Sequence, residues 1–208
     1  RDGQIASVMI YSRSDSAGAE WTRHCSMRAS VLAVSNGVGA ALPVQAIVAR
    51  CAEDVAPAAF YEHWRTRGNQ WGATFQGIAC LNAGRGEAIA RIEVPAAVAA
   101  LRDAHFAHPA ILDACVQVLA ATVGKSRQGA FVGKSVGAVR VHASLGEGPL
   151  WSHALLHDEE NPQSRSICGD LLVCNKAGQI VVELLKVRFE FIDFAVAATH
   201  GRERWLHA

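Results

Sequence analysis

Residues 109–123 form a run in which nearly every side chain is apolar, and this run constrains the fold more than any other part of the chain. Pro109 suits the first position of a helix and Gly124 suits the residue after its end, so the run is predicted to be helical. Its plainly polar side chains are Asp113, Gln117 and Thr122. A helix that is apolar on all sides must be buried on all sides, so other elements have to enclose it.

Apolar runs typical of strands lie on both sides of this helix and are separated by short turn sequences. They cover residues 74–82, 86–94, 131–143, 150–157, 166–174 and 179–192, and a short helix is predicted over 58–67. Half of the 208 residues are hydrophobic, which is enough for a packed interior. A sheet wrapped round one buried helix is the hot-dog arrangement. We therefore predict an α+β hot-dog fold, with a long central helix wrapped by antiparallel strands.

The chain divides into four predicted parts. These parts are residues 1–34, 35–57, 58–192 and 193–208. The first contains two strand-like runs, residues 5–12 and 21–34, joined by a polar turn, which is a hairpin pattern. The second is rich in Gly and Ala and is predicted to be a linker. The third carries the hot-dog elements, and the fourth is predicted to be a linker that follows the domain.

Charge and composition exclude several classes of protein. With 20 basic and 19 acidic residues, the net charge is +1, and no basic stripe suggests nucleic acid or an anionic membrane as a partner. No apolar stretch approaches the ~20 residues of a membrane span, and the N-terminus has no apolar signal core. The chain begins at Arg1 and not at Met, so we expect it to be part of a longer protein.

Cysteine and histidine spacing gives no sign of a metal site. The six cysteines, at 25, 51, 80, 115, 168 and 174, form no C-x-x-C pair, so we expect buried reduced thiols in a cytoplasmic protein. A triad of His105, His108 and Asp113 would lack a fourth ligand, so no metal is expected. His153 and His157 lie just before an acidic pair and are predicted to be solvent-exposed.

Asp113 and Gln117 are four residues apart, so they project from the same face of the predicted helix. Apolar surroundings raise the pKa of a carboxyl group, and a carboxyl that stays protonated can act as a general acid. Gln117 can orient that carboxyl or donate to a substrate oxygen. The residues alone leave a second interpretation equally open: Asp113 can be a structural carboxylate bound by loop amides near the helix start, where the helix dipole favours it.

Several ordered motifs resemble the dehydratase domains of polyketide synthases. Residues 108–117 (His-Pro-Ala-Ile-Leu-Asp-Ala-Cys-Val-Gln) resemble the family motif His-Pro-x-x-Leu-Asp-x-x-x-Gln. Residues 61–77, which contain the run Arg-Gly-Asn-Gln-Trp-Gly-Ala-Thr-Phe-Gln-Gly at 67–77, are similar to the signature Gly-x-x-Tyr-Gly-Pro-x-Phe-x-Gly. Residues 131–141 and 178–191 resemble later strands of the family, and residues 21–25 resemble the Trp-x-x-His-Ala run that ends its N-terminal hot dog. The resemblance covers about residues 5–192.

The resemblance implies a double hot-dog fold, of which residues 1–34 end the N-terminal half and residues 58–192 form the C-terminal half. It implies elimination of water from a 3-hydroxyacyl chain on an acyl carrier protein, giving a 2-enoyl product, with Asp113 as the acid and Gln117 beside it. The residues expected at the substrate are Trp71, Gly72, Phe75, His108 and Pro109. No cofactor is implied beyond the phosphopantetheine arm that carries the substrate. The implied partners are the acyl carrier protein, adjacent synthase domains and a second copy in a homodimer.

Three departures from the family pattern affect this interpretation. Trp71 stands where the family has Tyr, and Ala73 stands where it has Pro. The family motif His-x-x-x-Gly-x-x-x-x-Pro, which supplies the catalytic base, is absent, because Arg28 and Ala33 follow His24 at the Gly and Pro positions. We expect the base upstream of this chain, which would then hold half an active site. The alternative is a non-catalytic or cyclising, product-template-like double hot-dog domain that binds the acyl chain.

Overall fold

The structure of the chain is a computed structural model, and it describes residues 5–16, 18–31, 41–99, 105–123, 129–146, 148–157 and 164–192. The chain divides into two compact units. One consists of residues 1–37 with 199–208, and the other of residues 38–198. The predicted linker over residues 193–208 lies outside the described residues.

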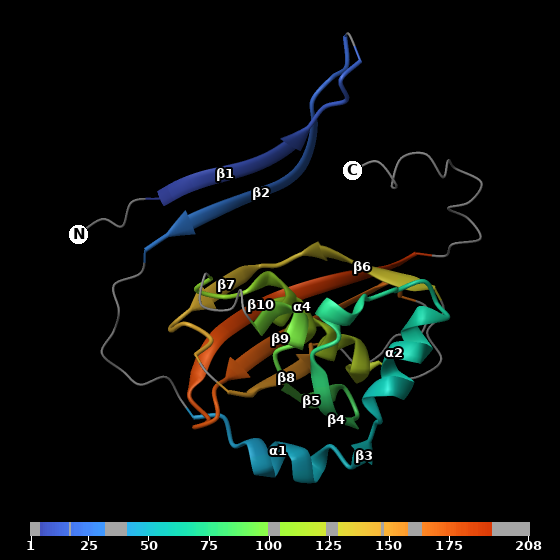
Figure 1. Cartoon of the computed structure of the whole chain (residues 1–208), viewed down its shortest axis with the longest axis vertical. Coiled ribbons are helices and arrows are strands. Elements are labelled where there is room, and N and C mark those ends of the chain that lie inside the picture. Colours follow the sequence, from blue (N-terminus) through green and yellow to red (C-terminus); the bar gives the residue numbers. More distant parts are fainter. Residues whose placement is uncertain are drawn as a thin grey trace. The chain divides into compact units, whose positions relative to one another are not determined.

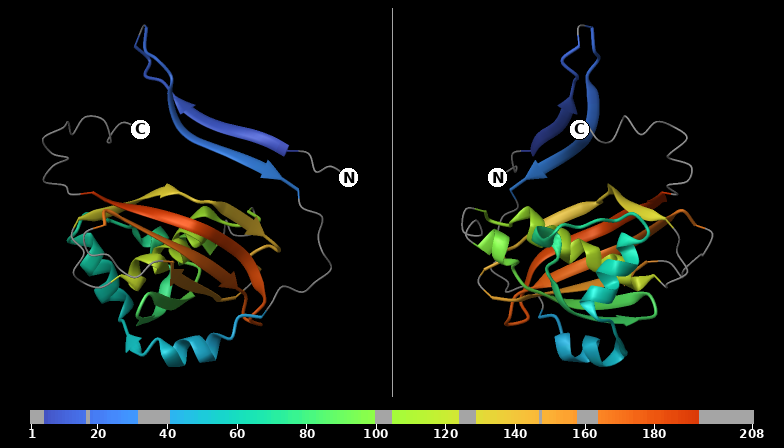
Figure 2. Two further views of the ribbon diagram at one scale, coloured as in Figure 1. Left: turned by 180° about the vertical axis from the view of Figure 1, so that it is seen from behind. Right: turned by 45° about the vertical axis from the view of Figure 1, so that its right-hand side comes forward.

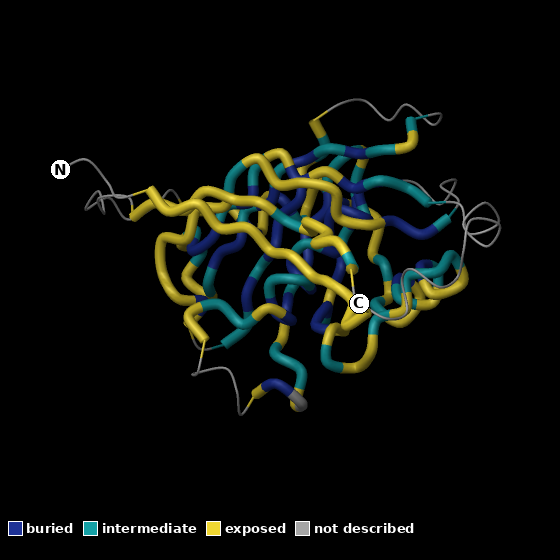
Figure 3. Tube along the Cα trace, turned by 90° about the horizontal axis from the view of Figure 1, so that it is seen from above, coloured by how far each residue is buried: buried dark blue, intermediate teal, exposed yellow. Residues whose placement is uncertain are grey.

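The described part of the first unit is a two-stranded antiparallel hairpin, as predicted. Strand β1 (Ile5–Ser12) pairs with β2 (Thr22–Ser30), and the register shifts between Ile10 and Tyr11. Every residue of β1 is exposed, and only Cys25 of β2 is partly covered, so the two strands that follow the N-terminus are drawn mostly in yellow in Figure 3. A two-stranded hairpin alone is at best marginally stable in water, so its pairing adds little to the stability of the chain.

The second unit is built on one antiparallel sheet of eight strands. Its strands are β3 (Glu53–Asp54), β4 (Ile78–Gly84), β5 (Glu87–Ile92), β6 (Ala130–Ser135), β7 (Ala138–Val141), β8 (Leu150–Leu156), β9 (Ser166–Cys174) and β10 (Ile180–Ile192). Their order is β3-β4-β5-β8-β9-β10-β6, and β7 pairs with another part of β10. The sheet curves round a central helix (Figures 1 and 2). This arrangement confirms the predicted α+β hot-dog fold.

The central helix is α4 (Pro109–Gln117), which continues as a 3-10 helix over Val118–Thr122. The side chains of Ile111, Cys115 and Leu119 are buried among strand residues, as the apolar run predicted. Inside this core the Ser152 hydroxyl of β8 donates to the Cys115 carbonyl at 2.9 Å. The prediction of one long helix was correct for its position and burial, but its last five residues form the tighter 3-10 coil.

Two glycines allow the neighbouring backbone to approach the central helix very closely. A methyl group at Gly169 of β9 would lie 2.6 Å from Leu119 Cδ1 and 2.6 Å from the Leu155 carbonyl oxygen. A methyl group at Gly77 would lie 3.0 Å from the Cβ atom of Ala114. Carbon atoms at van der Waals contact lie about 3.5–4.0 Å apart, so neither position can hold a side chain unless its neighbours move.

The segment predicted to be a linker with one helical turn, residues 35–57, contains a longer helix in its described part. Residues Val44–Arg50 form helix α1, and Ala41 makes an isolated bridge to Gln179 of the neighbouring loop. Val44 and Ile47 of α1 are buried in a second cluster that includes Ile89 and Cys174. Two buried apolar side chains are enough to anchor this helix of seven residues. Because they are so few, the Gly- and Ala-rich composition of the segment gave no clear helical pattern.

His153 corrects a further prediction. His153 lies on the face of the sheet that α1 covers, and the residue is only 7% exposed. The sequence had predicted a solvent-exposed histidine. Its Nε2 atom lies 2.6 Å from the Glu87 carboxylate, which also accepts two hydrogen bonds from Arg50 of α1. Glu87 lies on β5, 66 positions away in sequence, so the local pattern could not reveal this partner. His157 is exposed, as predicted.

The remaining elements lie close to their predicted ranges. Helix α2 covers Pro57–Arg65 and a short 3-10 helix, η1, covers Ala73–Phe75. The predicted strand over 131–143 is divided into β6 and β7, because Gly137 passes close to Lys186 of β10. Helix α3 (Ala96–Ala99) was not predicted. Among the described residues, no helix is long and apolar enough to cross a membrane.

Candidate active site

Asp113 and Gln117 lie together on α4, as their spacing predicted. Gln117 Nε2 donates to Asp113 Oδ2 at 2.7 Å and to the backbone carbonyl of Phe75 at 3.0 Å. Both acceptors need an N–H donor, so they fix the orientation of the amide group. Gln117 is 2% exposed, whereas Asp113 is half-buried, so the carboxyl keeps an open side.

The surroundings of Asp113 favour its protonated form. Burial raises the pKa of the Asp113 carboxyl above its usual value, and the hydrogen bond from Gln117 acts in the opposite direction. Burial also raises the pKa of the neighbouring Cys115 thiol to about 12, so that thiol stays protonated. Burial therefore shifts the pKa of Asp113 in the direction that a general acid requires.

The side-chain oxygen of Gln117 has no partner within the described residues. This Oε1 atom is buried and accepts no hydrogen bond there. A buried acceptor without a partner costs about 1–3 kcal/mol unless water or another donor satisfies it.

Tyr61 is a residue of this region that the sequence analysis did not single out. Its hydroxyl accepts a hydrogen bond from the Ile78 backbone N–H at 3.1 Å. Burial raises the pKa of Tyr61 to about 12, and the negative charge of Asp113 adds to this shift. Tyr61 therefore lies near enough to Asp113 for the two groups to interact. Its place within the motif-bearing segment 61–77 was the available signal.

Trp71 lies in an aromatic cluster at the edge of the core. Its ring stacks on Phe60 at 6.2 Å between centroids, meets Tyr61 edge-on at 5.9 Å and is tilted against Phe131 at 5.7 Å. These contacts are those of core packing, and they place Trp71 next to Tyr61. Phe75 presents its backbone carbonyl to Gln117, while its side chain is 39% exposed.

His108 and Pro109 have clear structural roles at the start of α4. Pro109 occupies the first helical turn, and the His108 Nδ1 atom accepts a hydrogen bond from the Ala110 N–H at 3.2 Å. His108 thus caps the helix that carries Asp113, and its ring lies 4.8 Å from that of His105. Within the described part of the chain, no group of His, Cys, Asp and Glu side chains is arranged to hold a metal ion.

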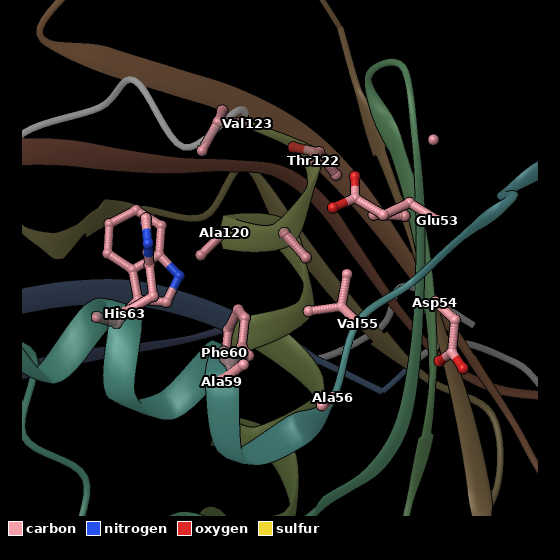
Figure 4. A pocket seen from close by; sticks show the side chains of 14 residues that line it. Glu53, Asp54, Val55, Ala56, Ala59, Phe60, His63, Ala120, Thr122 and Val123 are labelled. Atoms are coloured by element: carbon pink, nitrogen blue, oxygen red, sulfur yellow. The ribbon is translucent and has the colours of Figure 1, made fainter.

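Helix α2 separates two cavities, and neither is lined by Asp113. The first, of about 540 Å³, lies between β3, α2 and the end of the 3-10 helix; Figure 4 shows Val55, Phe60 and Val123 around it, with the carboxylates of Glu53 and Asp54 on one side. The second, of about 570 Å³, lies on the other side of α2. It is lined by Ala58, Tyr61, Glu62, Arg65, Asn69, Gln70, Trp71, Gly72 and Gln76.

The second cavity contains two of the predicted substrate-binding residues, Trp71 and Gly72. It shares Tyr61 with the surroundings of Asp113. Its lining mixes amide side chains with one aromatic wall, a composition suited to a ligand that has both polar and apolar parts. Phe75, His108 and Pro109 do not line it.

All six cysteines of the chain are free thiols. Cys51, Cys115 and Cys174 are buried, as expected, but Cys80 is exposed although it lies in an apolar run. The reason is strand alternation, which turns Cys80 away from the face that Leu81 buries against the core.

Comparison with solved structures finds dehydratase domains with the same fold. The dehydratase domain from the CurF module of the curacin polyketide synthase is 20% identical, with a TM-score of 0.77, over 91% of this chain and 64% of that one. A trans-AT polyketide synthase dehydratase domain from Brevibacillus brevis is 20% identical, with a TM-score of 0.79, over 91% and 66%. The dehydratase domain of RzxB from Pseudomonas fluorescens is 23% identical, with a TM-score of 0.74, over 89% and 64%.

The chain therefore spans less than two thirds of the length of these relatives. At such low identities the structural similarity establishes the fold alone. The family is established by the match of the amino-acid sequence to a family model. The family model described as the polyketide synthase dehydratase N-terminal domain matches residues 39–194, which is most of the chain. With the fold, the motif residues and this match in agreement, the chain belongs to the polyketide synthase dehydratase family.

Proposed function

We propose that this chain carries the acid half of a dehydratase site, which eliminates water from a 3-hydroxyacyl thioester to give a 2-enoyl thioester. The observation that carries the proposal is the half-buried Asp113 carboxyl, whose pKa is raised by burial and whose Oδ2 atom is held by Gln117 at 2.7 Å. Because a protonated carboxyl accepts through its carbonyl oxygen, Gln117 leaves Oδ1 as the atom that bears the proton.

In the proposed reaction a base removes the proton from carbon 2 of the acyl chain, and the bond between carbon 3 and its hydroxyl oxygen breaks. Asp113 gives its proton to the departing hydroxyl, which leaves as water, and Asp113 becomes a carboxylate. The Gln117 hydrogen bond then stabilises that carboxylate. In the family motif the base is a histidine, and these 208 residues do not contain that motif. No metal or redox cofactor takes part in this scheme.

Two related structures support the need for an aspartate and a histidine in a dehydratase of this fold. They are inactive mutants of the CurK dehydratase, one with an aspartate replaced by asparagine and one with a histidine replaced by phenylalanine. By extension, we propose Asp113 as the aspartate of this chain that the reaction needs. The substrate would arrive on the phosphopantetheine arm of an acyl carrier protein, and Trp71 and Gly72 would contact it in the second cavity.

The proposal is tested with the full natural protein that contains these residues. A 3-hydroxyacyl carrier protein is incubated with it, and loss of water is followed by mass spectrometry. Asp113→Asn should lower the rate by roughly 10²–10⁴-fold, because an amide cannot deliver the proton. Asp15→Asn, in the hairpin turn, is the matched control and should keep the parental rate. If the Asp113→Asn protein remains folded and turns over at the parental rate, Asp113 is structural.

The same assay separates the proposal from the alternative of a binding-only domain. If the parental protein binds the acyl carrier protein substrate but releases no water, the domain binds the acyl chain without dehydrating it. If it converts the substrate into a ring, the cyclising alternative is correct.

A further inference from the structure

The outer face of the sheet carries a second group of reactive side chains: Cys168, His157 and Asp170. The Cys168 Sγ atom lies 3.8 Å from Nδ1 of His157, and Nε2 of His157 lies 2.9 Å from Oδ1 of Asp170. Cys168 and Asp170 are two residues apart on β9, and His157 directly follows β8. A nucleophile, a base and a carboxylate that orients the base are the parts of a nucleophilic catalytic site.

This group lies on the opposite face of the sheet from Asp113. Gly169 lies directly against Leu119 of the central 3-10 helix, and Leu171 is buried in the same core. Side chains alternate along a strand, so Cys168 and Asp170 point away from that core. The group is therefore separate from the proposed dehydratase site, and its properties do not depend on that proposal.

The Asp170 carboxylate favours one tautomer of His157. It accepts a hydrogen bond from the Lys186 backbone N–H at 2.7 Å, and its Oδ1 atom lies 2.9 Å from His157 Nε2. A carboxylate oxygen attracts a proton on the nitrogen that faces it, so this contact favours the proton on Nε2. In the neutral ring Nδ1 then has a free lone pair, and this atom faces the Cys168 thiol.

Two backbone features keep these side chains in place. Lys186 has a left-handed backbone, with φ of 53°, at the point where the pairing register of β9 and β10 shifts. Left-handed conformations are uncommon for residues other than glycine, and this one turns the Lys186 N–H toward Asp170. On the other side, the His157 N–H donates to the Cys168 carbonyl at 3.0 Å, which fixes the spacing of base and thiol.

We propose that Cys168 is a nucleophilic thiol, with His157 as its base and Asp170 as the group that orients it, and that it is modified by small uncharged carbon electrophiles. In the step the sulfur forms a bond to the electrophilic carbon while the leaving group departs with its electron pair. The thiol proton passes to His157 Nδ1, and Asp170 stabilises the resulting imidazolium. The thiol and both partners are partly exposed, so such a molecule can reach them.

The chain supplies its own comparison thiols. Cys51, Cys115 and Cys174 are buried, and their reaction would report unfolding. Cys80 is exposed, and its sulfur accepts a hydrogen bond from Arg91, with no imidazole in that contact. Exposure alone would therefore make Cys80 react faster than Cys168, whereas base assistance reverses this order.

The experiment treats the 208-residue chain with iodoacetamide for increasing times and quantifies alkylation of each cysteine by peptide mass spectrometry. Cys168 should react faster than Cys80. His157→Ala should slow Cys168 by roughly tenfold, less than the contribution of a base in an enclosed active site, and should leave Cys80 unchanged. His142→Ala is the matched control, because His142 makes a similar exposed pair with Glu183 at 2.9 Å. It should leave the Cys168 rate unchanged.

A second variant protects the test against misfolding. Asp170→Asn keeps the shape of the side chain and an acceptor oxygen for the Lys186 N–H, but it removes the negative charge that stabilises the imidazolium of His157. It should also slow Cys168. If His157→Ala makes the buried cysteines react, Asp170→Asn decides the question. A Cys168 rate that does not exceed that of Cys80, or that is unchanged in a folded Asp170→Asn chain, overturns the proposal.

Discussion

Gln117 joins Asp113 to the backbone of the segment that precedes β4, because one Nε2 atom donates both to Asp113 Oδ2 and to the Phe75 carbonyl. The position of the carboxyl thus depends on two elements, helix α4 and the η1 turn. Any change in one of these hydrogen bonds should alter the other.

Replacing Gln117 by leucine should raise the pKa of Asp113 further. The Gln117 hydrogen bond favours the charged carboxylate and opposes the effect of burial, so its loss leaves burial unopposed. The measurement is a pH titration of the Asp113 side-chain carbon by nuclear magnetic resonance, with Asp113→Asn to assign the signal. A pKa that falls in the leucine variant would show that Gln117 does not stabilise the carboxylate.

Gly77→Ala should destabilise the fold and disturb Asp113. The added methyl would lie 3.0 Å from both the Ala114 Cβ atom and the Glu93 carbonyl oxygen. Such overpacking costs typically about 1–3 kcal/mol in the free energy of unfolding. Gly133→Ala is the matched control, since a methyl there would meet nothing within 4 Å. Urea denaturation of both variants tests this, and equal stabilities would contradict the close approach of Gly77 to α4.

Asn69→Ala should loosen the aromatic cluster around Trp71. The Asn69 amide donates to the Phe131 carbonyl at 2.8 Å and accepts from the Phe131 N–H at 2.9 Å, so it continues the pairing of β6 like a strand. Alanine leaves two partly buried backbone groups without these partners, at a cost of about 1–3 kcal/mol. Urea denaturation followed by tryptophan fluorescence measures this loss, and Gln70→Ala, at the adjacent exposed position, should show none.

Stability should fall on acidification through the cluster of His153, Glu87 and Arg50. Burial lowers the pKa of His153, and the Arg50 hydrogen bond lowers the pKa of Glu87. In both cases the unfolded chain binds protons more readily than the folded one. The contribution of His153 is therefore complete above about pH 6.5, the usual histidine value, and declines below it; that of Glu87 declines at lower pH.

Urea denaturation between about pH 5 and pH 8 checks this expectation, since histidine titrates within that range. The parental chain should lose more stability over this range than His153→Leu, whose buried position no longer titrates. If the stability of the parental chain and that of His153→Leu depend on pH in the same way, His153 does not cause the loss of stability on acidification.

The sequence could predict the features that depend on local pattern. The apolar run at 109–123 predicted the buried helix, and the spacing of Asp113 and Gln117 predicted their common face, because helix periodicity determines both. The pairing of His153 with Glu87 joins residues far apart in sequence and had no local signal. The close approaches at Gly77 and Gly169 depend on how the strands pack on the helix, which composition does not reveal.

The change from α-helix to 3-10 helix at Val118 alters how far the central element extends. A 3-10 coil rises about 2.0 Å per residue where an α-helix rises about 1.5 Å, so the five residues Val118–Thr122 gain about 2.5 Å in length. The coil is also thinner, which leaves room for the backbone of β9 at Gly169. With the same number of residues, the core element thus reaches further toward Val123 than an α-helix would.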